Sequence, residues 1–115
     1  MVYITLNEAN FQERVLGSKE PVLVEFFAEW SGAHHIMAPG LIEMDGKYGS
    51  YVKFCRIDID ENKDLAMQYG VQSVPTIILF KNGQIIDQLV GVIPRAVIAQ
   101  KLDDLIELEI LGVDC

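Results

Sequence analysis

The chain has few cysteines, a shortage of basic residues and no long apolar run. Cys55 and Cys115 are its only cysteines in 115 residues, too few for the disulfide framework of a small secreted domain. Nine Lys and Arg face seventeen Asp and Glu, giving a net charge of −8. This balance argues against general binding to nucleic acid or to an anionic membrane, because both carry negative charge. The apolar stretches, such as residues 77–80, are far shorter than the roughly 20 residues that span a bilayer.

Signals for export, cofactors and metals are also absent. The N-terminus lacks the basic and apolar segments of a secretion signal, so we expect a cytoplasmic protein. No glycine-rich phosphate loop occurs, and we expect no cofactor. His34 and His35 are adjacent, and on a helix they point about 100° apart, which prevents them from sharing one ion readily. No other Cys or His stands at ligand spacing, so we expect no metal site.

What the sequence does contain is the material for one domain over residues 1–115. It is 50% hydrophobic and 23% charged, the balance of an ordinary globular protein with a core. Apolar periodicity predicts five strands and four helices in the order βαβαβαββα, and the Asn82-Gly83 pair predicts a hairpin between the last two strands. We expect strands near residues 2–6, 22–28, 52–59, 76–80 and 85–90, and helices near residues 7–16, 31–48, 61–69 and from 94 onward. This alternation predicts an α/β fold whose sheet is parallel at first and has an antiparallel edge.

Several motifs in this order resemble the thioredoxin family over residues 2–106. They are Val24-Glu25-Phe26-Phe27-Ala28-Glu29-Trp30, Ala38-Pro39, Asp58-Ile59-Asp60 with Tyr69-Gly70-Val71, Val74-Pro75-Thr76, and Phe80-Lys81-Asn82-Gly83 with Val90-Gly91. The resemblance implies a thioredoxin fold, with helices on both faces of a mixed central sheet. It also implies a cis peptide bond before Pro75. Residues 107–115 lie beyond it and form a C-terminal extension.

The departure from the family falls on its chemistry. Thioredoxins carry Trp-Cys-Gly-Pro-Cys where this chain has Trp30-Ser31-Gly32-Ala33-His34, so Ser31 and His34 occupy the positions of the redox cysteines. Dithiol exchange needs one thiolate that attacks a disulfide and a second thiol that resolves the mixed disulfide. Serine and imidazole do neither. We therefore expect no catalytic residue at this loop and a redox-inactive protein.

Other chemistry for the same residues has less support. Ser31, His34 and Glu25 could be read as nucleophile, base and acid, but no nucleophile-elbow motif surrounds Ser31, which we interpret as a helix N-cap. We interpret Cys55 as a buried structural thiol. Cys115 is expected to be exposed and to link two chains through a disulfide on oxidation.

Glu25 is the one acid in an otherwise apolar strand, and a buried carboxylate requires a partner. Thioredoxins place a buried Asp and a neighbouring Lys at the positions of Glu25 and Arg56. The resemblance therefore implies a buried charge cluster of Glu25, Arg56 and His34, in which we expect the ion pair with Arg56 first and a contact with His34 second. The alternative is that His34 points into solvent.

The resemblance also implies a peptide-binding surface. Its residues are Trp30, Gly32, Ala33, Val74, Pro75, Gly91 and Val92, all apolar or glycine, and we call this set the Trp30 surface. An exposed apolar patch of this kind usually marks an interaction site. The sequence thus favours a module that binds a protein or an extended peptide, such as a folding or assembly helper. Two alternatives remain: a thioredoxin-type disulfide oxidoreductase of cell redox homeostasis with an altered or engineered site, or a passive subunit with an inherited surface.

Overall fold

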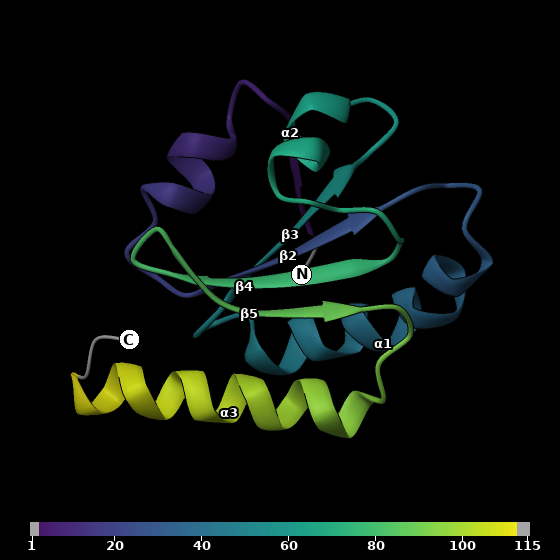
Figure 1. The fold of residues 1–115 in the computed structure, drawn as a ribbon. Coiled ribbons are helices and arrows are strands. Elements are labelled where there is room, and N and C mark those ends of the chain that lie inside the picture. The colour runs from purple at the N-terminus through teal and green to yellow at the C-terminus, as the bar shows by residue number, and fades with distance from the viewer. Residues whose placement is uncertain (1–2, 113–115) are drawn as a thin grey trace.

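A computed structural model describes residues 3–112 of the protein, which form five strands and four helical segments (Figure 1). Strong β formers build the strands, and turn residues such as Asn82 and Gly83, both with positive φ, separate the last two. In chain order the elements are β1 (Ile4–Leu6), η1 (Gln12–Leu16), β2 (Val22–Phe27), α1 (Gly32–Tyr48), β3 (Lys53–Asp58), α2 (Lys63–Gln68), β4 (Thr76–Lys81), β5 (Gln84–Val90) and α3 (Arg95–Leu111).

The strands form one mixed sheet in the order β1-β3-β2-β4-β5. β3 pairs in parallel with β1 and with β2, whereas β4 runs antiparallel to β2 and β5 antiparallel to β4. The predicted α/β fold, parallel at first with an antiparallel edge, is confirmed. β2 lies at the centre, and every one of its residues is buried, as its nearly continuous apolar sequence predicts.

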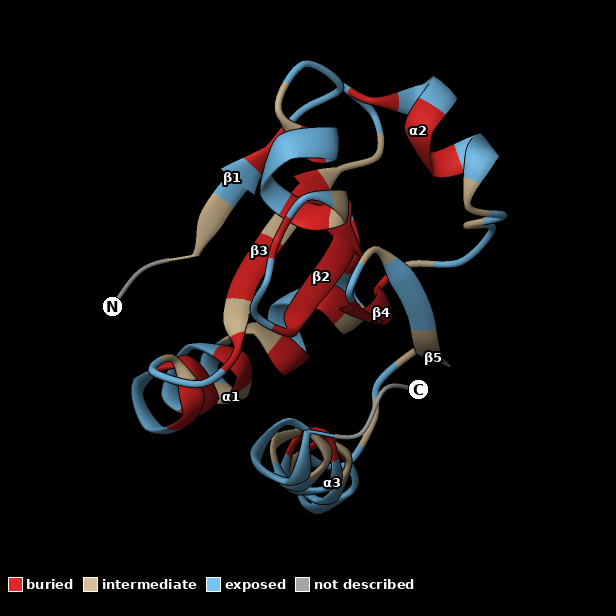
Figure 2. Cartoon of the chain, turned by 90° about the vertical axis from the view of Figure 1, so that its left-hand side faces the viewer, coloured by how far each residue is buried: buried red, intermediate tan, exposed pale blue. Residues whose placement is uncertain are grey.

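Helices cover both faces of the sheet. In Figure 1, η1 and α2 lie on one side of it and α1 and α3 on the other. Side chains alternate along β2: Val24 packs into the core beside η1 and α2, whereas Leu23 packs into the core beneath α1 and α3. Figure 2 shows the buried residues gathered on the central strands and on the inner sides of the helices. By the same alternation Glu25 faces the side of α1, and this places its carboxylate beneath the start of that helix.

The first helix differs from the prediction at its boundaries. It is a single short π-helix, η1, because the side-chain oxygen of Asn7 accepts hydrogen bonds from Ala9 N and Asn10 N at 2.8 and 3.0 Å and closes a separate turn. At the other end of the chain, α3 continues into the C-terminal extension as far as Leu111. Residues 107–111 contain no Gly or Pro, and the helix ends at Gly112 with a φ of 71°.

Within residues 3–112 no helix combines the length and the apolar character needed to cross a bilayer. Cys115 lies outside the described residues, so its expected role in a disulfide-linked dimer stays a prediction.

Candidate functional site

Ser31 stands at the N-terminus of α1 and ties this helix to a second loop. Its Oγ accepts a hydrogen bond from His34 N at 3.1 Å, which confirms the predicted N-cap. The same hydroxyl donates to the carbonyl oxygen of Val74 at 3.3 Å. Ser31 is buried, so both roles of its oxygen are structural.

The loop before β4 is held from two sides. The Val74–Pro75 peptide bond is cis. Beside it, Gly91 N donates to the Pro75 carbonyl oxygen at 2.8 Å, and Thr76 Oγ1 donates to the Ser73 carbonyl oxygen at 2.6 Å. Together with the Ser31 hydroxyl, these bonds hold three distant parts of the sequence against one another: the start of α1, the loop before β4 and the end of β5.

His34 turns inward and meets the acid of β2. A hydrogen bond of 2.7 Å joins His34 Nδ1 to Glu25 Oε2, and the two side chains are 6% and 0% exposed. The imidazole also stacks on the Phe27 ring, with centroids 4.7 Å apart and an interplanar angle of 26°. Glu25 and Phe27 lie two residues apart on one face of β2, so His34 covers both. The alternative of a solvent-facing His34 is wrong.

Arg56 does not take the place expected of it. It is the register neighbour of Glu25 on β3, yet its guanidinium lies over the Phe27 ring, 5.2 Å from the centroid. Within residues 3–112 no ion pair joins Arg56 to Glu25, and Arg56 Nε is buried without a hydrogen-bond partner. The expectation that Arg56 would be the first partner of Glu25 is wrong, because the long side chain of Arg56 reaches beyond the carboxylate to an aromatic face.

Burial dominates the protonation of Glu25. It raises the pKa of this carboxyl above its ordinary value, and the hydrogen bond to His34 and the positive charges of His34 and Arg56 oppose that rise in part. Among residues 3–112, Glu25 Oε1 is buried without a hydrogen-bond partner. The site therefore favours the protonated, uncharged form of the Glu25 carboxyl more than water does.

The geometry does not assemble a nucleophile, base and acid. The Ser31 hydroxyl bonds to two backbone groups, and in the described part of the chain no hydrogen bond joins it to the His34 ring. His35 is exposed, and its Nε2 lies 2.7 Å from the Glu29 carbonyl oxygen. Among residues 3–112, no three side chains of the metal-binding types come together.

Cys55 lies in β3 and is fully buried. Its burial raises the pKa of the thiol to about 12. A thiol with this pKa stays protonated at neutral pH and is a poor nucleophile. The predicted role of Cys55 as a structural core residue fits this environment.

The Trp30 surface is only partly open to solvent. Trp30 is 69% and Val92 is 49% exposed, whereas Pro75 is buried and offers little contact area. The remaining members are either exposed or half-buried: Gly32 is exposed, and Ala33, Val74 and Gly91 are half-buried. Sequence reasoning missed Asp60, whose Oδ2 accepts a hydrogen bond of 2.8 Å from the Trp30 indole N–H and thereby fixes one edge of the ring. It also missed the role of Phe27, whose ring contacts both His34 and Arg56. In the sequence Phe27 is one more apolar residue of the β2 run.

Comparison with known proteins adds a family to this geometry. A sequence model of the family described as Thioredoxin matches residues 2–104. Thioredoxin 1 of Synechococcus elongatus is 40% identical over 102 residues, which cover 89% of this chain and 95% of that protein. The thioredoxin of Synechocystis is 41% identical over 98 residues, covering 85% and 92% of the two chains, and that of Alicyclobacillus acidocaldarius is 39% identical over 104 residues, covering 90% and 98%.

Proposed function

The chain belongs to the thioredoxin family, and from this premise we propose that it binds an extended segment of another protein at the Trp30 surface and does not exchange disulfides. Such a module would help a partner to fold or assemble in the cytoplasm. One observation carries the proposal. Both residues at the positions of the family's redox cysteines are held by structural hydrogen bonds, Ser31 to backbone groups and His34 to Glu25.

The loss of redox chemistry is supported by the atoms at these two positions. Exchange requires a sulfur that forms a bond to the substrate sulfur and a second sulfur that releases it. The Ser31 hydroxyl is buried, and the His34 ring nitrogen Nδ1 is hydrogen-bonded to the Glu25 carboxyl. Neither group supplies sulfur, so a mixed disulfide with a substrate cannot form at these two positions.

The binding role is supported by what remains accessible. Trp30 stands out into solvent while Asp60 holds its indole N–H, so the ring is both exposed and oriented. Fixed aromatic rings lose little conformational entropy on binding and often dominate the affinity of an interface. The loop before β4 and the segment at Gly91 are fastened beside the start of α1, and this gives an extended segment a rigid surface to lie on.

The alternative of a disulfide oxidoreductase is favoured by the relatives, which are named thioredoxins. For this chain it would have to use Cys55 or Cys115. Cys55 is enclosed in the sheet with a raised pKa, and its reaction with a protein disulfide would require β3 to open. We therefore favour the binding role.

Two measurements test the proposal. In a dithiothreitol-coupled insulin turbidity assay the protein should match the blank. A phage library of random decapeptides should yield binders to the wild-type chain that Trp30→Ala loses and that Ile110→Ala retains. Ile110 is a matched control because it is 76% exposed and lies near the far end of α3.

Two outcomes would overturn this function. Reductase activity that disappears in Cys55→Ser or Cys115→Ser would assign the reaction to that thiol. Peptides that bind Trp30→Ala as tightly as the wild type would place binding elsewhere on the molecule, and a library without binders would leave the Trp30 surface as an inherited feature.

A further inference from the structure

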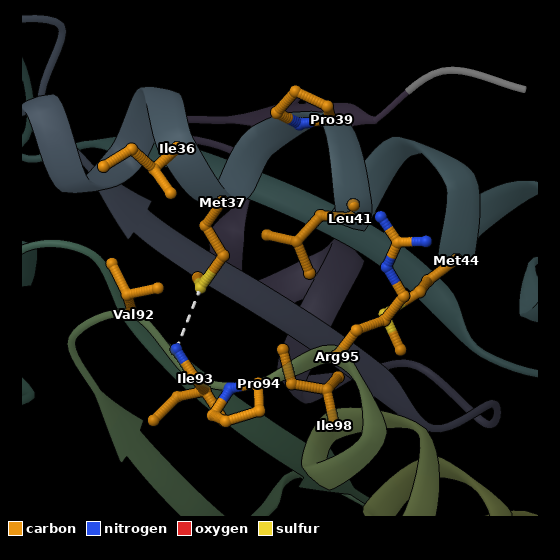
Figure 3. A pocket seen from close by; sticks show the side chains of 11 residues that line it. Ile36, Met37, Pro39, Leu41, Met44, Val92, Ile93, Pro94, Arg95 and Ile98 are labelled. Carbon is orange, nitrogen blue, oxygen red and sulfur yellow. Dashed lines mark hydrogen bonds between the residues drawn. The ribbon is translucent and has the colours of Figure 1, made fainter.

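An apolar groove lies between α1 and the segment that leads into α3 (Figure 3). Met37 and Leu41 of α1 form one wall, and Ile93 and Ile98 form the other. The groove has a volume of about 280 Å³, near the lower end of the range for ligand pockets. It is large enough for one or two side chains of a partner.

One charged side chain and one weakly bonded backbone N–H lie at this groove. Arg95 is the only ionisable residue that lines it in the described part of the chain. The Ile93 N–H donates to Met37 Sδ at 3.4 Å, and a thioether sulfur is a weak acceptor. A guanidinium and a weakly satisfied backbone N–H beside aliphatic walls fit a ligand that combines an apolar group with an anionic oxygen.

Arg95 packs against α1 at Gly40. A side-chain carbon at Gly40 would lie 3.3 Å from Arg95 Nε and Nη2, close enough that the guanidinium would have to shift slightly to accommodate it. Arg95 Nη1 donates to Glu43 Oε1 at 3.2 Å, and the Arg95 side chain is 56% exposed. A guanidinium has five N–H donors, and more than half of this side chain is accessible to a partner.

The groove is continuous with the Trp30 surface through Val92, which belongs to both. Figure 3 places Ile36 and Val92 at one end of the groove and Arg95 at the other. An extended segment that crosses the Trp30 surface would reach the groove at Val92. In an extended chain, successive residues rise about 3.3 Å and their side chains alternate in direction. One side chain of a segment can therefore enter the groove while another close by contacts Arg95 at its edge.

We propose that this groove selects the partner segment: it takes an aliphatic side chain of the segment, and an Asp or Glu side chain close by in the same segment pairs with Arg95. This inference rests on the proposed peptide-binding function and specifies its ligand. A net charge of −8 repels acidic peptides in general. If the chain nevertheless prefers a segment with an acidic residue, the attraction must come from a nearby positive charge. Arg95 supplies that charge, because it is the cation that lines the groove.

The test is a pair of selections from one library of acetylated, C-terminally blocked random decapeptides. The wild-type chain should enrich peptides with an aliphatic residue near Asp or Glu, and the Arg95→Glu variant should enrich Lys or Arg in place of the acid. For a wild-type peptide, Arg95→Gln should weaken binding about tenfold, the effect of losing one charge-assisted hydrogen bond. Arg14→Gln, which removes the same charge from η1, should leave the affinity unchanged.

The results distinguish the proposed peptide binding at the Trp30 surface from the proposed selection of the segment by the groove. Peptides that depend on Trp30 but show neither an acidic preference nor a response to Arg95→Gln would overturn the groove inference and leave the binding function standing. Peptides that merely copy the exposed end of α3 would indicate self-association and would also overturn it. A library that yields no Trp30-dependent peptide would overturn both.

Discussion

His34 Nδ1 lies 2.7 Å from Glu25 Oε2, and neither side chain is more than 6% exposed. This hydrogen bond links the loop at the start of α1 to the central strand of the sheet. Removal of either partner leaves the other without its hydrogen bond, and this makes the pair a sensitive point of the fold.

The first prediction concerns the dependence of stability on pH. Burial raises the pKa of Glu25 above its unfolded value. The folded state therefore keeps a proton that the unfolded state has released. Stability from this group is fully present below about pH 4.5 and is lost as the pH rises through the higher folded pKa. Urea denaturation should show that the wild type loses more stability than Glu25→Gln between about pH 4.5 and 8. Parallel curves for the two proteins would contradict the raised pKa.

The second prediction ranks the two basic neighbours of Glu25. His34→Ala should lower the free energy of unfolding by about 3 kcal/mol near neutral pH, because it leaves a buried carboxyl without its hydrogen-bond partner. Arg56→Ala should cost about 1 kcal/mol, because it loses a cation–π contact with Phe27 and some packing. Arg14→Ala is the control for loss of a positive charge. A larger loss in Arg56→Ala than in His34→Ala would restore Arg56 as the main partner of the acid.

The third prediction restores the missing chemistry. The combined changes Ser31→Cys, Ala33→Pro and His34→Cys should yield a chain that forms a reversible disulfide and reduces insulin above the blank. The N-terminus of α1 favours a negative charge, and a thiolate at position 31 would stand at that end of the helix. The matched control is His34→Cys with Ala33→Pro alone, which lacks the attacking thiol. A folded triple variant without a disulfide would indicate that the loop geometry is unsuited to the exchange.

The fourth prediction concerns Asp45, a residue of α1 that is 1% exposed. Neither of its carboxyl oxygens has a hydrogen-bond partner among residues 3–112, and burial raises the pKa of this group. Asp45→Ala should therefore stabilise the protein by about 1 kcal/mol at neutral pH, because it removes a desolvated carboxylate from a helix and adds a better helix former. The gain should shrink as the pH falls through the raised pKa of the folded state toward the ordinary value of 3.8, because the folded protein then neutralises the buried carboxylate by taking up a proton. A loss of stability at neutral pH would show that Asp45 has a partner of its own.

Much of the fold follows from local sequence patterns. The apolar run of β2 predicts a central strand, and Asn82-Gly83 predicts the β4–β5 hairpin, because burial on both faces and a tight turn each require particular residue types. Ser31 as an N-cap follows likewise, because its partner His34 N is three residues away in the sequence. The replacement of both redox cysteines is visible in the sequence without any structure.

The contacts of the site were decided by packing between distant segments. Sequence showed that Glu25 needed a partner, and the resemblance ranked Arg56 before His34. The structure reverses that order, because the choice depends on how far each side chain reaches above β2. The hydrogen bond from the Trp30 indole to Asp60 joins residues 30 positions apart. The groove forms only where α1 meets residues 92–98. Residue types set which groups must be buried or paired, whereas only the folded chain determines which atoms come within bonding distance.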